Sequence, residues 1–148
     1  MIPYKIGHIE TKQFAIFPDK FINGEIVNIK ANYNFNLRSD WAQVRCASTI
    51  QFVQNEQLIL VLEIVCYFDI APEGVEFIKE QNKVPVEFLR YMATIVVGTA
   101  RGVIHAKTEG TVISSVVLPP INLVDAIKDE IVINGQPKSD LIPKPSNV

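Results

Sequence analysis

Residues 42–70, AQVRCASTIQFVQNEQLILVLEIVCYFDI, contain two segments in which apolar and polar side chains alternate. The first segment runs from Ala42 to Phe52, and the second covers residues 58–70. A period of two is typical of a β-strand with one buried face. The polar residues 54–57 between the two segments predict a turn. The stretch is therefore expected to form an antiparallel hairpin.

Both cysteines of the chain lie in this hairpin. An antiparallel register around a three-residue turn at 55–57 places Cys46 directly opposite Cys66 on the apolar face. A cysteine at such a position is more often an inert small hydrophobe than a nucleophile. We expect two free thiols and no disulfide, because a reducing compartment disfavours the bridge.

Two further strands and one long helix are expected. Alternation in residues 25–37 and, more weakly, in residues 6–17 predicts strands that extend the antiparallel sheet. Apolar residues at helical spacing follow from Leu89 to Ile104, and Gly110 suits the end of that helix. The β-branched run at 94–97 favours a strand, so a strand remains the alternative there.

Length and composition indicate one domain. A chain of 148 residues with 48% apolar content can bury a single core. We assign residues 1–130 to this domain, with a short last helix near 122–129. Residues 131–148 are expected to form a mobile C-terminal tail, because prolines are frequent there and apolar side chains are few.

Charge and hydropathy patterns argue against two classes of partner. The formal net charge is −2, and lysines and arginines are scattered along the chain. Such a distribution offers neither nucleic acid nor an anionic membrane a basic patch. The first residues lack the pattern of a signal peptide, and Glu63 interrupts the longest apolar run. We expect a cytoplasmic protein.

The residues that usually carry chemistry are sparse. His8 and His105 are the only histidines, and neither has metal-ligand partners at a suitable spacing. No nucleophile is accompanied by a nearby base in the sequence. The sequence therefore predicts no metal, no cofactor and no enzymatic activity, because an enzyme needs a concave site with convergent polar groups.

The segment GTARGVI, residues 98–104, places two glycines four residues apart. A phosphate-binding loop usually has a lysine and a hydroxyl side chain after the second glycine, whereas Val103 and Ile104 follow here. Glycine destabilises a helix by roughly 1 kcal/mol relative to alanine. Gly98 and Gly102 therefore indicate a helix face that another backbone approaches closely, and a tolerated local weakness is the alternative.

Four segments of the chain, taken in order, are IGHIETKQFAIF (6–17), LEIVCYFDI (62–70), TARGVIHAKTEGT (99–111) and LPPINLVDAI (118–127). Together they resemble the SecB family of bacterial protein-export chaperones. The resemblance implies a four-stranded antiparallel sheet with helices packed on one face, which is an α+β fold. It also implies a homotetramer, a dimer of dimers in which the long helices pack between two sheets, with Gly98, Arg101 and Gly102 at the contact.

SecB is an ATP-independent holdase, so the resemblance also implies a function. Such a protein binds unfolded, non-native polypeptides in long apolar grooves and passes them to the export motor SecA. Capture of this kind needs exposed apolar surface without a rigid, selective pocket. The alternative is that the candidate residues seal the edge of the core. The client-binding candidates are Phe17, Phe21, Ile22, Leu123 and Ile127.

Other features depart from the family pattern. Of the acidic positions on which the motor docks, only Glu63 matches, because Gln13 and Phe17 occupy the two positions in the first strand. We therefore expect binding to SecA to be weak or absent. Some relatives protect an antitoxin instead. The alternative function is a SecB-fold interaction protein dedicated to one partner, such as an antitoxin.

Overall fold

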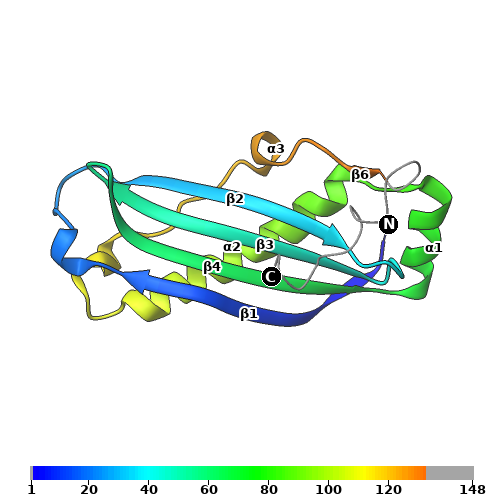
Figure 1. The fold of residues 1–148 in the computed structure, drawn as a ribbon, viewed down its shortest axis with the longest axis horizontal. Helices are drawn as coiled ribbons and strands as arrows, with labels where there is room; N and C mark the ends of the chain where they lie inside the picture. Colours follow the sequence, from blue (N-terminus) through cyan, green and yellow to red (C-terminus); the bar gives the residue numbers. More distant parts are fainter. Residues whose placement is uncertain (1, 133–148) are drawn as a thin grey trace.

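The computed structural model describes residues 2–132 and has an α+β fold, a four-stranded antiparallel sheet with helices (Figure 1). The strand order is β1-β4-β3-β2, so that β1 and β2 form the two edges. The long helix α2 (Val86–Thr108) runs across one face and packs on β3 and β4. The predicted fold class is confirmed. The strands are β1 (Tyr4–Ile16), β2 (Asn28–Leu37), β3 (Gln43–Gln54) and β4 (Gln57–Ile70).

The β3–β4 hairpin has the predicted register but not the predicted turn. Cys46 pairs with Cys66, as expected. The turn consists of Asn55 and Glu56 alone, both with positive φ (49° and 63°), which is the backbone that two-residue hairpins favour. A bulge after Phe52 shifts the pairing by one residue and restores the register. The prediction of a three-residue turn was therefore wrong.

The core lies between the helix-facing side of the sheet and α2. The central strands contribute fully buried side chains such as Leu62 and Phe68, and α2 contributes Leu89, Met92 and Val96. Alternation in the strands and a period of 3.6 in the helix direct these side chains to one shared layer. The predicted apolar faces of β4 and of the long helix are the ones that this core buries.

A helix that the sequence did not reveal follows the sheet. Helix α1 (Pro72–Gln81) starts with a proline in its first turn and ends at Asn82 in the left-handed conformation. The segment resembles a turn because it contains Pro72 and Gly74. A Cβ atom on Gly74 would lie 2.7 Å from side-chain carbons of both Ile2 and Ile70. Glycine is present here because the helix packs too closely for any side chain.

Helix α2 forms despite its β-branched run, so the strand alternative for residues 94–97 was wrong. The hydroxyl of Thr94 donates to the carbonyl of Arg90 at 2.9 Å, and burial of Val96 and Val97 offsets their weaker helix propensity. Pro85 precedes the helix, and Gly110, with φ of +80°, follows it.

The chain after α2 returns along the helix. It passes through a 3-10 turn, η2 (Val112–Ser115), and a short helix, α3 (Leu123–Ala126), before β6 (Ile131–Val132) pairs with β5 (Lys83–Val84). The predicted last helix is thus shorter than expected. Residues 133–148, most of the predicted mobile tail, lie outside the described residues.

Two arginines of α2 hold this returning segment. Arg101 donates from Nε to the carbonyl of Leu118 at 2.7 Å and from Nη2 to that of Pro119 at 2.9 Å. Arg90 donates from Nε to the carbonyl of Ile127 at 2.9 Å. The two arginines are three helical turns apart and therefore lie on one side of α2. This side is fastened to the chain's own backbone.

Within residues 2–132, no helix is both long enough and apolar enough to span a membrane.

Candidate functional site

An apolar groove lies where the start of β1, helix α1 and the start of α2 meet, at the end of the molecule that carries α1 in Figure 1. Its volume is about 540 Å³. We call it the aromatic groove, because four of its lining side chains are aromatic. It is lined by Ile2, Tyr4, Phe77, Pro85, Glu87, Phe88 and Tyr91.

Aromatic contacts join the groove to the core. The ring of Tyr4 packs edge-to-face on Phe88, with centroids 5.0 Å apart, and on Phe68, at 5.6 Å. Phe88 and Phe68 are buried, and Tyr4 is half-buried. Burial, with a smaller contribution from Tyr91, raises the pKa of the Tyr4 hydroxyl, which therefore stays neutral at physiological pH. The floor of the groove is fixed and uncharged.

The rim of the groove is open. Tyr91 is 62% exposed although it is a large aromatic residue. Ile6 and Ile9 of the edge strand β1 are each 44% exposed, and they pair with Phe68 and Cys66, whose side chains face the core. Beyond the groove itself, these two isoleucines of β1 are also partly exposed. An open apolar groove is a kind of surface at which another chain can bind.

The predicted client-binding residues of the β1–β2 connection lie at the other end of the molecule. Phe17 and Ile22 flank the 3-10 turn η1 (Pro18–Lys20), where they are partly exposed, and Lys20 lies over the Phe17 ring. Phe21 lines a separate hollow of about 460 Å³ together with Val112 and other residues that follow α2. These three residues are near one another, but they are not part of the aromatic groove.

The other two candidates lie near the beginning of α2 instead. Leu123 is half-buried in α3, and the carbonyl of the next residue, Val124, accepts a hydrogen bond from Arg90. Arg90 and Thr108, the last residue of α2, are separated by 18 residues, or roughly 27 Å along the helix. The predicted residues therefore do not converge on one groove.

Ile127, the last of the client-binding candidates, lies in the core, which is the alternative that the sequence left open for it. Its side chain is 5% exposed and belongs to the core. The physical reason is the hydrogen bond from Arg90 to the Ile127 carbonyl, which holds the end of α3 against α2.

The predicted oligomer contacts divide between two sides of α2. Gly98 and Gly102 are exposed, and a Cβ atom on either would meet nothing within 4 Å. Their side of the helix is open, so packing within residues 2–132 does not require a glycine at either position. Arg101 differs, because its guanidinium holds the carbonyls of Leu118 and Pro119. The structure thus gives Arg101 a role inside the chain.

Glu63, the predicted motor-docking residue, lies on the sheet face opposite α2. It pairs with Gln13 on β1 and with Thr49 on β3. It also lines a polar hollow of about 330 Å³ that includes Arg45 and Asn36. Amide, hydroxyl and guanidinium groups thus surround this carboxylate.

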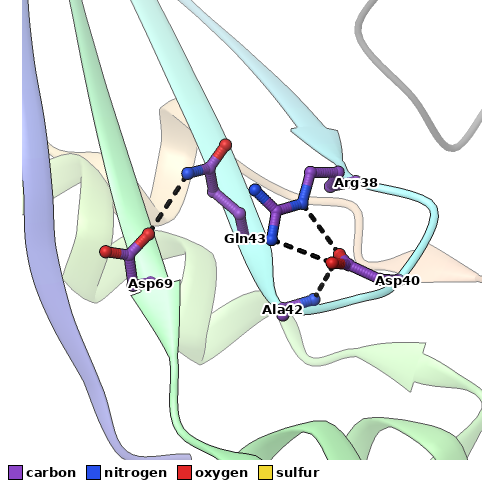
Figure 2. A network of polar contacts seen from close by, with 5 residues as sticks. All are labelled: Arg38, Asp40, Ala42, Gln43 and Asp69. Atoms are coloured by element: carbon purple, nitrogen blue, oxygen red, sulfur yellow. Dashed lines mark hydrogen bonds and ion pairs between the residues drawn. The ribbon is translucent and has the colours of Figure 1, made fainter.

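A polar network fixes the turn between β2 and β3 (Figure 2). Arg38 holds Asp40 through two hydrogen bonds of 2.8 and 2.9 Å, and Asp40 also accepts from the Ala42 backbone at 3.1 Å. The bond from Arg38 lowers the pKa of the Asp40 carboxyl. Nearby, Gln43 donates to Asp69 at 3.2 Å. These groups satisfy one another, and their evident role is to shape the hairpin.

The cysteines are free thiols inside the core. Burial raises the pKa of both, that of Cys66 to about 11, which keeps them protonated and unreactive. His8 stacks near Tyr67, and His105 lies 3.8 Å from Glu109 on the helix surface. Among residues 2–132, no three His, Cys, Asp or Glu side chains gather in a way that could hold a metal ion.

Comparison with known proteins adds one similar fold. No protein-family model matches the chain, and no curated protein matches it. Among solved structures, a similar chain is the Mycobacterium tuberculosis Rv1957 SecB-like chaperone, in complex with a ChAD peptide from the Rv1956 HigA1 antitoxin. The likeness concerns the fold alone. Sequence identity is 14%, the alignment covers 80% of this chain and 87% of that chain, and the TM-score is 0.38.

Sequence reasoning missed the aromatic groove because it missed α1. Without that helix, Phe77 had no assigned place and the start of α2 had no neighbour. One signal was present: Phe88 and Tyr91 are three residues apart and therefore adjacent on the helix surface, beside the stripe that was assigned to the core.

Proposed function

We propose that the protein is an ATP-independent, SecB-like holdase that binds non-native polypeptides, with the aromatic groove as its principal binding surface. The observation that carries the proposal is the groove itself, an open apolar hollow with the exposed ring of Tyr91 at its rim. The proposal involves no catalytic step and no cofactor.

The chemistry of the groove suits an unselective ligand. Each Å² of apolar surface removed from water contributes about 25 cal/mol, whatever the sequence of the captured segment. Aromatic side chains offer large contact areas with little loss of conformational entropy. Only Glu87 among the lining residues is charged, so few polar groups impose an orientation on the ligand.

The proposal includes assembly of several copies, a dimer of dimers. The open side of α2 around Gly98 and Gly102 would let a second backbone approach closely, and β1 is an edge strand whose outward backbone groups can pair. Replacing Gly102 by leucine should lower the mass measured by light scattering while the sheet stays folded. An unchanged mass would remove Gly102 from the contact.

A role dedicated to one partner, such as an antitoxin, is the second candidate. The hollow beside Phe21, separate from the aromatic groove, favours it, because two distant sites can together select one ligand. Either role fits a cytoplasmic protein. Binding to SecA is expected to be weak, since Glu63 is flanked by Gln13 rather than by a second carboxylate.

Aggregation of a chemically unfolded, unrelated protein tests the proposal. Light scattering should rise more slowly when this protein is added without nucleotide. Two variants assign the site: Tyr91→Ser should reduce the protection, whereas the paired change Phe21→Ser and Ile22→Ser should reduce it less. Protection of one partner but of no unrelated protein would favour the dedicated role, and a wild-type protein that protects nothing would refute the holdase.

A further inference from the structure

The described part of the chain ends beside the aromatic groove. Val132 of β6 pairs with Lys83 of β5, and Ile131 pairs with Val84. Pro85, which follows β5 directly, lines the groove. Two residues of backbone span at most about 7 Å, so the chain that continues from Val132 starts close to the groove.

The segment beyond Val132 contains a sequence that matches the groove. Residues 141–145 read Leu-Ile-Pro-Lys-Pro, which joins two apolar side chains to a lysine between two prolines. Prolines favour the extended polyproline II conformation, and such segments dock in grooves lined by aromatic rings. We propose that residues 141–145 of the same chain occupy the aromatic groove.

Charge complementarity sets the expected orientation. Glu87 is the single charged residue among those that line the groove, and Lys144 is the single charged residue in 141–145. An ion pair at a partly apolar site adds specificity to a contact whose free energy comes mainly from apolar burial. Leu141 and Ile142 would then lie against the aromatic rings.

The length of the connection suits this contact. Residues 133–140 form a spacer of eight residues that can reach about 26 Å when extended. A short tether gives an effective concentration on the order of millimolar, so that a contact of millimolar intrinsic affinity is formed in about half of the molecules. A weak intrinsic affinity between residues 141–145 and the groove is therefore sufficient for the contact to form.

The contact has a regulatory consequence, which rests on the proposed function. A client segment would have to displace residues 141–145 before it could bind. The tethered segment would thus weaken client binding and favour clients with larger apolar surfaces. The contact itself exists or fails independently of any client.

Paramagnetic relaxation enhancement in the full chain tests the inference. A spin label on an Asn147→Cys variant should broaden the amide signals of Phe88 and Tyr91, and the native thiols are buried and resist labelling. The paired change Leu141→Ser and Ile142→Ser should abolish the broadening. A control pair outside the segment, Gln136→Ser and Lys138→Ser, should retain it. Glu87→Lys should weaken the broadening, and adding Lys144→Glu should restore it.

Three results would overturn the inference. The amide signals could stay sharp, they could broaden equally in both serine pairs, or they could broaden only when labelled and isotope-enriched chains are mixed. The last result would mean that a second copy supplies the segment. Because no client is present, failure here is distinguishable from failure of the holdase proposal.

Discussion

The sheet core and the aromatic groove contain the same kinds of side chain in opposite situations. Leu62 of β4 is fully buried in the core between the sheet and α2. Tyr91, a residue of α2 itself, is 62% exposed at the groove. The difference arises because Leu62 lies in the layer between the sheet and α2, whereas Tyr91 lies at the open groove formed by the starts of β1 and α2 together with α1. Apolar residues thus stabilise the fold in one region and remain available for binding in the other.

The two regions should respond very differently to truncation, and the core should show the largest effect. Leu62→Ala is expected to destabilise the protein by about 2–5 kcal/mol, because it leaves a cavity among fully buried neighbours. Urea unfolding measures the change. Ile26→Ala is the matched control, since Ile26 is 80% exposed and its loss should alter stability by no more than about 0.5 kcal/mol. Equal losses of unfolding free energy in the two variants would contradict the distinction between buried and exposed apolar residues.

Gly74 joins the two regions, because α1 forms one wall of the groove. Gly74→Ala is expected to destabilise by about 1–3 kcal/mol, since the added Cβ would overlap Ile2 and Ile70. Thermal unfolding measures it. In Gly98→Ala the new Cβ meets nothing, so greater helix propensity should stabilise a single chain by up to about 1 kcal/mol. A stabilised Gly74→Ala would show that α1 packs less closely than described.

Arg101 tests how firmly the returning segment is held to α2. Arg101→Met keeps the aliphatic stem but removes two hydrogen bonds to the carbonyls of Leu118 and Pro119. We expect a loss of about 1–2 kcal/mol, reduced because the group is half-buried. Amide hydrogen exchange in residues 116–118 should accelerate, since Pro119 and Pro120 have no amide hydrogen. Arg38→Met, which breaks an exposed pair, should leave that exchange unchanged.

The smallest effect on stability is expected at the groove. Tyr91→Ser should change the free energy of unfolding by about 0.5 kcal/mol or less, because the side chain is mostly in water already. Urea unfolding beside Leu62→Ala provides the comparison. A loss as large as that of Leu62→Ala would mean that Tyr91 supports the fold and is not free for a ligand.

The sequence predicted the strands and the long helix better than the tertiary contacts between them. Alternation and an assumed three-residue turn placed Cys46 opposite Cys66. The sequence could not reveal that the turn has two residues and that a bulge after Phe52 compensates for it. The sequence did not reveal why residue 74 is a glycine, because its close contacts with Ile2 and Ile70 arise only once α1 packs in the fold. The resemblance placed Arg101 at an oligomer contact, whereas its hydrogen-bond acceptors are the chain's own carbonyls.

The candidate site was predicted least well, for the same reason. Phe17 and Ile22 are exposed, as expected, but exposure alone did not reveal which apolar residues share a concave surface. The groove requires Tyr4 of β1 and Phe77 of α1, which are far apart in the sequence. The packing of α1 against Ile2 and Ile70 brings these elements together.

Photo-crosslinking of an unfolded polypeptide to the intact protein tests the central claim most directly. The polypeptide would carry a photoreactive group, and mass spectrometry would locate the crosslinked residues. We predict crosslinks in the segments that contain Tyr4, Phe77 and Tyr91, with fewer in Tyr91→Ser. Crosslinks concentrated around Phe17, Phe21 and Ile22 instead, or an equal yield from Tyr91→Ser, would contradict the assignment of the aromatic groove as the binding surface.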